Sequence, residues 1–190
     1  MLFRSDASIS RDGQTILAGI VLWDLATAAI VETALAARRA VFPYVPGLLS
    51  FREAPAVLAA IRKLKTIPDA FIFDGQGRAH PRRLGLACHV GLLIDQPCLG
   101  CAKSRLTGRH DDPGLHRGDW RPLLAKGTDE VIGRVLRTRD RVKPLYVSVG
   151  HKCDLESAAD LVLTCATRYR QPEPTRDRKS TRLNSSHRIR

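Results

Sequence analysis

The segment Pro68-Asp-Ala-Phe-Ile-Phe-Asp-Gly-Gln-Gly77 carries the strongest signal for the fold class. Its apolar run, bounded by turn residues, predicts a short buried strand that ends at Asp74. An acidic side chain at the carboxyl end of such a strand faces the crevice in which α/β sheets bind ligands. Helix capping or an Asp-Gly turn is the alternative interpretation of Asp74.

The segments before this strand predict a hairpin, a loop and a helix. Apolar runs at 16–22 and 28–34 predict two strands joined by a short turn. Residues 42–48 contain two prolines and a glycine and predict a stiff loop. A helix is expected next, with Pro55 in its first turn and Lys65 near its end.

The segments after Gly77 alternate between helical and strand patterns. We expect a helix over 84–94, a strand over 98–102, an exposed loop over 107–118, a strand pair at 131–137 and 144–149, and a helix from 155 to about 168 that is capped by Asp154. Strands followed by alternating helices and strands predict an α/β domain with a mixed sheet.

Composition bounds the class of protein. The 190 residues suit one domain, and 44% hydrophobic with 26% charged residues exclude wholesale disorder. No apolar run is long enough to span a membrane, so no membrane association is expected. A net charge of +12 favours a polyanionic partner such as nucleic acid. Five cysteines, an odd number, favour a reducing cytoplasm over a disulfide framework.

The two ends of the chain look foreign to the rest. Residues 1–5 and 177–187 resemble translations of a common sequencing-library adapter, so we expect a non-native leader over 1–5, a domain over 6–176 and a non-native disordered tail over 177–190. A solvated basic tail is the alternative interpretation of the C-terminal end. The tail contributes +4 and Arg4 one further charge, so +7 remains without them.

Three acidic residues together suggest a metal site. Asp6 precedes a segment, 7–10, that can form the first strand, Glu53 lies at the start of the predicted helix, and Asp74 ends the buried strand. Carboxylates brought close together repel one another unless a cation lies between them. Mg²⁺ or Mn²⁺ prefers oxygen ligands, and such an ion can orient a water for attack on a phosphate.

The stiff loop exposes one aromatic residue. Tyr44 lies between Pro43 and Pro46, and Gly47 follows. A rigid apolar projection of this kind can enter a duplex and support a displaced base. The alternative is a hydrophobic plug over the core.

Basic residues and two histidines accompany the predicted strand ends. We expect phosphate contacts from Arg78, Arg82, Arg83, Lys103 and Arg105, and most strongly from Lys103, beside the metal. His80 and His151 can serve as acid, base or polar contact, although single histidines are commonly structural. Cys98 and Cys101 have no second pair of ligands for zinc and are interpreted as buried thiols.

Five sequence blocks, in order along the chain, resemble endonuclease V, the deoxyinosine 3′-endonuclease family. The blocks are 42–53, 73–82, 102–104, 149–151 and 172–176. The resemblance implies a ribonuclease H-like mixed sheet flanked by helices. It also implies Mg²⁺-dependent hydrolysis, with Mn²⁺ as a substitute, of the second phosphodiester bond 3′ to deoxyinosine in DNA. A monomeric, cytoplasmic repair enzyme is expected.

The resemblance also assigns roles to single residues. Asp6 and Asp74 match the metal-binding aspartates, Glu53 the third catalytic acid and Lys103 the active-site lysine. Tyr44 matches the wedge tyrosine. The residues expected to contact DNA or the flipped base are Tyr44, Pro46, Gly47, Gly75, His80, Arg82 and His151. Glycines among them let the backbone approach the base closely.

Two departures from the family pattern leave alternatives open. The family has a longer N-terminus, and a histidine follows the block that here ends at Arg176, where this chain has Asp177, Arg178 and Lys179. A lesion-binding or nucleic-acid-binding protein with impaired cleavage is therefore one alternative. An inosine-specific ribonuclease that acts on inosine-containing RNA is another.

Overall fold

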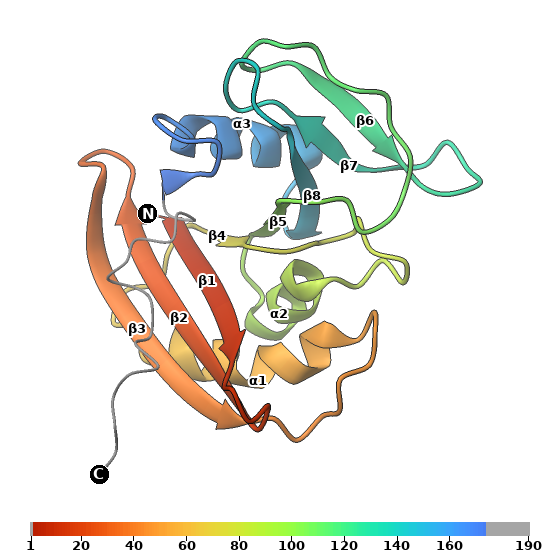
Figure 1. Ribbon diagram of the computed structural model, residues 1–190. Coiled ribbons are helices and arrows are strands. Elements are labelled where there is room, and N and C mark those ends of the chain that lie inside the picture. The colour runs from red at the N-terminus through yellow and green to blue at the C-terminus, as the bar shows by residue number, and fades with distance from the viewer. Residues whose placement is uncertain (1, 174–190) are drawn as a thin grey trace.

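The structure is a computed structural model that describes residues 2–173, with only the backbone of residues 3–6. Its elements are, in chain order, β1 (Leu2–Ile9), β2 (Thr15–Asp24), β3 (Ala29–Arg39), α1 (Leu49–Ile61), β4 (Ala70–Phe73), α2 (Leu86–Ile94), β5 (Cys98–Ala102), β6 (Trp120–Leu124), β7 (Val131–Leu136), β8 (Leu145–His151) and α3 (Leu155–Cys165). Figure 1 shows their arrangement.

Within the described residues, eight strands form one mixed sheet in the order β3-β2-β1-β4-β5-β8-β7-β6. The three strands β1, β4 and β5 run parallel at its centre, and the outer strands pair antiparallel. Parallel neighbouring strands need long crossover connections. Along the chain, α1 therefore precedes β4 in the connection from β1, and α2 connects β4 to β5. The expected mixed α/β sheet is confirmed.

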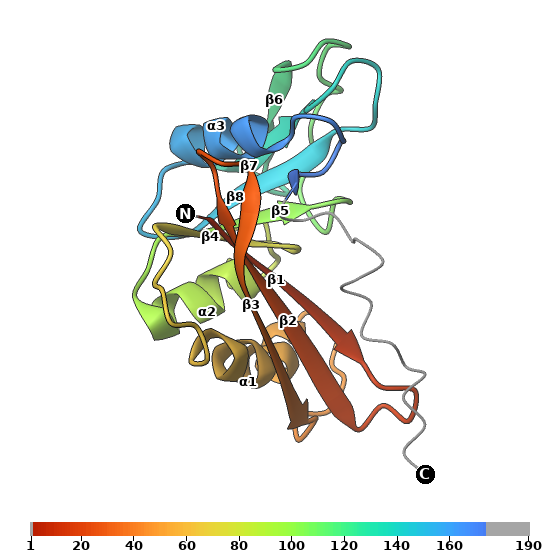
Figure 2. The same ribbon diagram turned by 90° about the vertical axis from the view of Figure 1, so that its left-hand side faces the viewer.

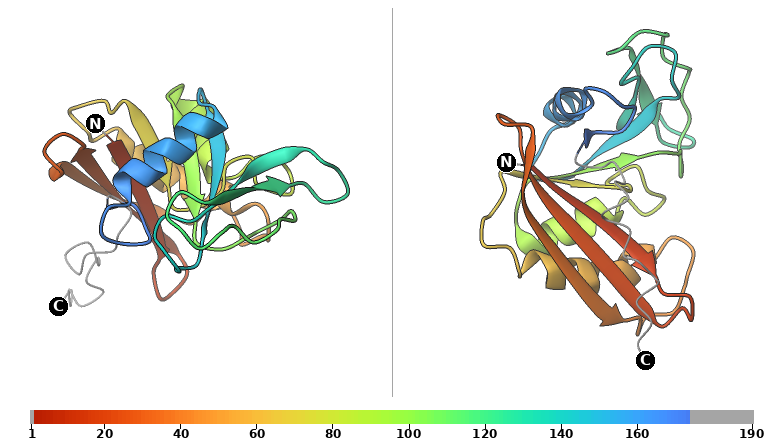
Figure 3. Two further views of the ribbon diagram at one scale, coloured as in Figure 1. Left: turned by 90° about the horizontal axis from the view of Figure 1, so that it is seen from above. Right: turned by 60° about the vertical axis from the view of Figure 1, so that its left-hand side comes forward.

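Helices cover both faces of this sheet, with α1 and α2 on one face and α3 on the other (Figures 1 and 3). The alternation of side chains in β4 explains why both faces are apolar. Phe71 and Phe73 belong to the core cluster packed against α1 and α2, whereas Ile72 belongs to the cluster packed against α3. A strand buried on both faces reads as a continuous apolar run.

Most predicted elements are confirmed. The predicted hairpin is β2 and β3, which run beside β1 as three adjacent long strands in Figure 2. The predicted strand pair is β7 and β8. Asp154 caps α3, because its Oδ1 accepts a hydrogen bond from the backbone N–H of Ser157 at 2.8 Å.

The predicted start of the first helix is wrong. The helix begins at Leu49, so Pro55 lies inside α1 rather than in its first turn. Pro55 has no N–H to donate to the carbonyl of Phe51. The buried face of α1 includes Ala54, Ala56 and Val57, and its packing against the sheet decides the helix despite this missing bond.

Strands β1 and β6 also differ from expectation. The first strand begins at Leu2, whose side chain is buried, and Asp6 lies inside β1 rather than before it. Strand β6 was not predicted. It forms the edge of the sheet, where the missing N–H of Pro122 is tolerated, and the Arg134 guanidinium lies 4.1 Å from the ring centroid of Trp120.

Two further expectations concern the C-terminal tail and membrane association. The predicted tail, 177–190, lies outside the described residues, as do Asp177, Arg178 and Lys179. No helix within residues 2–173 is long and apolar enough to cross a membrane.

Candidate nuclease site

A cavity of about 520 Å³ lies where α1, the 42–48 loop and the ends of β4 and β5 meet. It brings together residues that are distant in the sequence. Its lining includes the predicted site residues Tyr44, Pro46, Gly47, Glu53, Asp74, Gly75, His80 and Lys103, together with Arg105.

Parallel strand pairing places Asp74 and Lys103, two of the charged residues of the cavity, side by side. Asp74 follows β4 directly and Lys103 follows β5 directly, and β4 and β5 are parallel neighbours. The ammonium of Lys103 donates to Oδ2 of Asp74 at 2.6 Å. The Asp74 side chain is only 15% exposed, so this contact is screened less than a surface ion pair.

The backbone register places Asp6 next to Asp74. Ser5 pairs with Phe73 across the parallel β1–β4 ladder, so the next residues of the two chains, Asp6 and Asp74, follow at neighbouring positions. Neighbouring strands lie about 4.8 Å apart. The side chain of Asp6 is outside the described part of the structure, whereas the next residue, Ala7, lines the cavity.

The donor chemistry of the cavity suits a hard divalent cation. Asp74 and Glu53 both line it and offer carboxylate oxygens, the ligands that Mg²⁺ and Mn²⁺ prefer. Among the side chains that the structure describes, which exclude Asp6, no group of three or more His, Cys, Asp or Glu could hold a metal ion.

The loop that carries Tyr44 is held at its base. Phe42 stacks on Phe51 of α1 with ring centroids 5.6 Å apart, and the N–H of Leu48 donates to the carbonyl of Val45 at 2.9 Å. Tyr44 itself is 65% exposed while it lines the cavity. An exposed aromatic ring on a fixed support loses little conformational entropy when it binds.

Gly47 and Arg82 join this loop to the segment after β4. Gly47 has φ +78°, a left-handed conformation that favours glycine, and its carbonyl accepts from Nη1 of Arg82 at 3.3 Å. A Cβ at Gly47 would lie 2.7 Å from that same nitrogen. Arg82, predicted to contact DNA, therefore braces the Tyr44 loop.

Gly75 and Gly77 differ in their surroundings. A Cβ at Gly77 would lie 2.1 Å from the carbonyl oxygen of Val149, and the Gly77 N–H donates to Oγ of Ser148 at 2.9 Å. Gly77 thus seats the segment closely on β8. A Cβ at Gly75 would meet nothing within 4 Å, so Gly75 leaves open space in the cavity wall.

His80 is a buried member of the cavity wall. Its Nδ1 accepts from the backbone N–H of Arg82 at 3.2 Å, so the neutral ring carries its proton on Nε2. Burial, and secondarily the charge of Arg82, lower the pKa of His80 below its usual 6.5. His80 is therefore neutral at pH 7.

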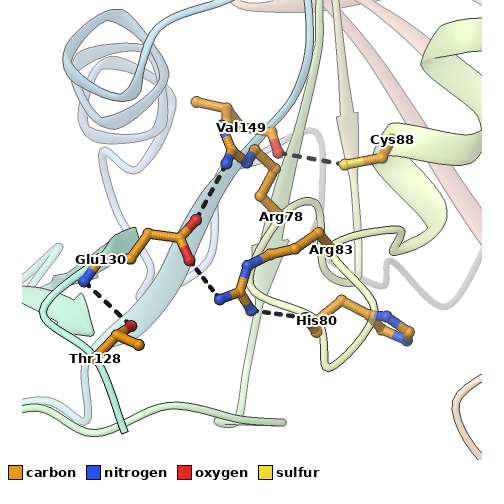
Figure 4. Close-up of polar contacts among 7 residues, drawn as sticks. All are labelled: Arg78, His80, Arg83, Cys88, Thr128, Glu130 and Val149. Atoms are coloured by element: carbon orange, nitrogen blue, oxygen red, sulfur yellow. Dashed lines mark hydrogen bonds and ion pairs between the residues drawn. The ribbon is translucent and has the colours of Figure 1, made fainter. Parts of the chain in front are cut away.

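The predicted phosphate-binding role of Arg78 and Arg83 is not supported by their positions. Figure 4 shows both guanidinium groups directed at the carboxylate of Glu130. Arg83 reaches it at 2.6 Å and Arg78 at 3.1 Å, and neither arginine lines the cavity. The two arginines lie near Asp74 in the sequence. In the structure, however, both form ion pairs with Glu130, which lies 47 residues beyond Arg83.

The predicted base contact of His151 is not supported either. Strand β8 runs antiparallel to β5, so His151 pairs with Cys98, at the opposite end of β5 from Lys103. Its Nε2 lies 2.9 Å from Oδ1 of Asp95, and it is not among the lining residues. Strand direction, which the sequence does not reveal, places His151 away from the cavity.

The interpretation of Cys98 and Cys101 as buried thiols is confirmed. Both are free and buried in β5. Burial raises the pKa of Cys101 to about 12 and that of Cys98 further, so neither is a thiolate near pH 7.

Two residues near the site were missed. Gln76 lines the cavity and its Nε2 donates to the carbonyl of Ser104 at 3.0 Å; its position two residues after Asp74 was an available signal. Arg170 donates to the carbonyl of Lys103 at 2.8 Å across 67 residues, and no local pattern could indicate that contact.

Comparison with known proteins agrees with this geometry. The family model described as Endonuclease V matches residues 2–179. Endonuclease V of Trichormus variabilis is 51% identical over 176 residues, which cover 93% of this chain and 76% of that protein.

Solved structures show the same likeness. The crystal structure of endonuclease V from Streptomyces avermitilis has a TM-score of 0.90 and 44% identity, over 94% of this chain and 78% of its own. Endonuclease V of Ciona intestinalis, solved with a 24mer DNA containing an inosine followed by a ribo-adenosine, has a TM-score of 0.78 and 28% identity, over 91% of this chain and 80% of its own. The expected ribonuclease H-like fold is confirmed.

Proposed function

This chain belongs to the endonuclease V family and is a nuclease, and we propose that it hydrolyses the second phosphodiester bond 3′ to deoxyinosine in DNA with Mg²⁺ as its cofactor. The observation that carries the proposal is the single cavity that Asp74, Glu53, Lys103 and the exposed Tyr44 line together. The DNA of the Ciona relative supports the choice of lesion.

The proposed metal ligands are Asp74 and, through the β1–β4 register, Asp6, with Glu53 as the third acid. When bound, Mg²⁺, or Mn²⁺ in its place, would orient a water and stabilise negative charge on the attacked phosphate. The pair Asp74–Lys103 supports this assignment, because the ammonium holds the Asp74 carboxylate in place at the end of β4.

Lys103 has a second proposed role. Its side chain is 50% exposed and extends from a strand end into the cavity, so it can contact a phosphate oxygen while it keeps Asp74 in place. An ammonium fixed beside the reacting phosphate stabilises the charge that develops there.

Tyr44 is the proposed wedge. The exposed ring would fill the gap that a flipped nucleotide leaves in the duplex.

The cavity is the proposed site of the flipped base, because its volume of about 520 Å³ is that of a small-molecule site. Pro46, Gly47, Gly75 and His80 line this cavity and are the proposed contacts of the flipped base. The open space at Gly75 allows close approach to the backbone.

The proposed setting is DNA repair by a cytoplasmic monomer. Free cysteines suit a reducing compartment, and the basic net charge of +12 suits a polyanionic substrate.

The test uses a 5′-labelled duplex with one deoxyinosine, incubated with Mg²⁺ or with EDTA. The expected result is a nick at the second bond 3′ to the lesion that requires Mg²⁺ and is absent on an undamaged duplex. A gel shift without a nick would overturn the proposed hydrolysis in favour of a lesion-binding protein that does not cleave.

A second candidate function is an inosine-specific ribonuclease. The ribo-adenosine in the DNA of the Ciona relative favours it. The same assay with inosine-containing RNA separates the two, because a ribonuclease would cleave the RNA at least tenfold faster than the deoxyinosine duplex.

A further inference from the structure

A single carboxylate bridges two arginines beside the cavity. Oε1 of Glu130 accepts from Nη2 of Arg78 at 3.1 Å, and Oε2 accepts from Nη2 of Arg83 at 2.6 Å. Figure 4 shows Glu130 reaching toward both arginines from the turn between β6 and β7. Arg83 and Arg78 lower the pKa of Glu130, so the bridge is ionised at neutral pH.

The two arginines mark the ends of the segment that carries His80. The backbone N–H and Nη1 of Arg83 both donate to the carbonyl of His80, at 2.9 and 3.2 Å. The N–H of His80 in turn donates to the carbonyl of Arg78 at 2.7 Å. A change in the position of either arginine would therefore be transmitted to His80.

Arg83 needs a contact that holds it. Its φ of +56° lies in the left-handed region, which is unfavourable for a residue with a Cβ. Such a conformation persists when the surroundings overdetermine it. The short hydrogen bond to Glu130 is a contact of this kind, and it comes from outside the 78–83 segment.

We propose that Glu130 is a positioning residue for the lesion cavity, because its bridge between Arg78 and Arg83 holds the His80 segment against the cavity. The proposal deepens the proposed function, on which it rests for the identity of the ligand. Arg78, Arg83 and Glu130 are not among the residues that line the cavity, whereas Asp74 and Lys103 are. Removal of the Glu130 charge should therefore raise KM for the lesion and leave kcat nearly unchanged.

The chain provides a matched control in the same turn. Asp129 is 93% exposed and pairs with Arg109 at 2.6 Å, outside the 78–83 segment. Glu130→Gln and Asp129→Asn remove the same charge from adjacent positions, so any general effect of net charge on DNA binding is common to both.

The experiment measures nicking of a deoxyinosine duplex and amide hydrogen exchange in both variants. For Glu130→Gln we expect KM to rise about three- to tenfold with kcat within twofold, and exchange at Arg83 to accelerate by about three- to tenfold. Asp129→Asn should leave both quantities at the wild-type values. Equal KM and equal exchange in Glu130→Gln and wild type would overturn the proposal.

A double-mutant cycle with Arg83→Gln gives an independent decision. If the bridge is the link, the double variant should raise KM no more than the larger single effect. A double variant whose increase in KM equals the product of the two single increases would overturn the proposal. A wild-type chain that fails to nick the deoxyinosine duplex would contradict the proposed function instead, and the exchange data would still decide whether Glu130 holds the segment.

Discussion

The Lys103 ammonium lies 2.6 Å from Oδ2 of Asp74, although 29 residues separate the two in the chain. They meet because β4 and β5 are parallel neighbours with Phe73 opposite Gly100, so Asp74 and Lys103 both follow the carboxyl end of their strand. The carboxyl ends of parallel strands are where α/β folds bind ligands.

Asp74→Asn is expected to abolish nicking while it spares binding. The amide is a neutral, weaker ligand for Mg²⁺ and no longer forms an ion pair with Lys103. We expect kcat to fall by about a hundredfold or more with an unchanged gel-shift affinity. Asp112→Asn, in the exposed loop before β6, is the matched control, and retained cleavage in Asp74→Asn would remove Asp74 from the metal site.

Tyr44→Ala is expected to weaken discrimination between inosine and undamaged DNA. The ring is exposed on a loop fixed at its base, and stacking on a base contributes about 1–3 kcal/mol. The ratio of kcat/KM for the two duplexes should fall about fivefold or more. Tyr44→Phe keeps the ring and should retain the ratio; an unchanged preference in the alanine variant would count against the wedge.

Gly77→Ala and Gly75→Ala should separate stability from activity. The Gly77 variant forces a Cβ against the Val149 carbonyl, so its free energy of unfolding should fall by about 2–4 kcal/mol in urea titrations. Gly75→Ala has open space and should fold normally, yet lose activity because a methyl group then occupies the proposed base contact. Wild-type nicking by Gly75→Ala would show that the substrate does not use this space.

His80 is expected to make the protein less stable in mild acid. The pKa of the folded state lies below the unfolded value of 6.5, so between these two values the unfolded chain binds a proton that the folded chain does not. The free energy of unfolding should therefore be intact above pH 6.5 and decline as the pH falls through the window below it.

The check is urea unfolding at pH 7.5 and pH 5.5. His80→Asn should show a smaller decline than the wild type, while the decline due to His89, whose pKa burial also lowers, should remain. Identical declines in the wild type and His80→Asn would contradict the assignment.

Local sequence patterns predicted those features that depend on neighbours along the chain. The apolar run before Asp74 indicated β4, and Asp154 indicated the start of α3. The position of Pro55 led to a wrong prediction of where α1 begins, because packing of the helix outweighs the backbone hydrogen bond that proline cannot form. Strand β6 was not predicted because it contains Pro122, and proline is tolerated in a sheet mainly in edge strands.

The sequence alone determined the mixed α/β class and the candidates Asp74, Glu53, Lys103 and Tyr44, because apolar periodicity, turn residues and family-like blocks are local properties. Only the tertiary structure decided which candidates share a cavity. Lys103 and Asp74 form an ion pair because their strands are parallel neighbours, whereas His151 lies at the opposite end of β5. Arg78 and Arg83 both form ion pairs with Glu130. Strand direction and long-range charge pairing are set by how the whole chain packs, and no single segment encodes them.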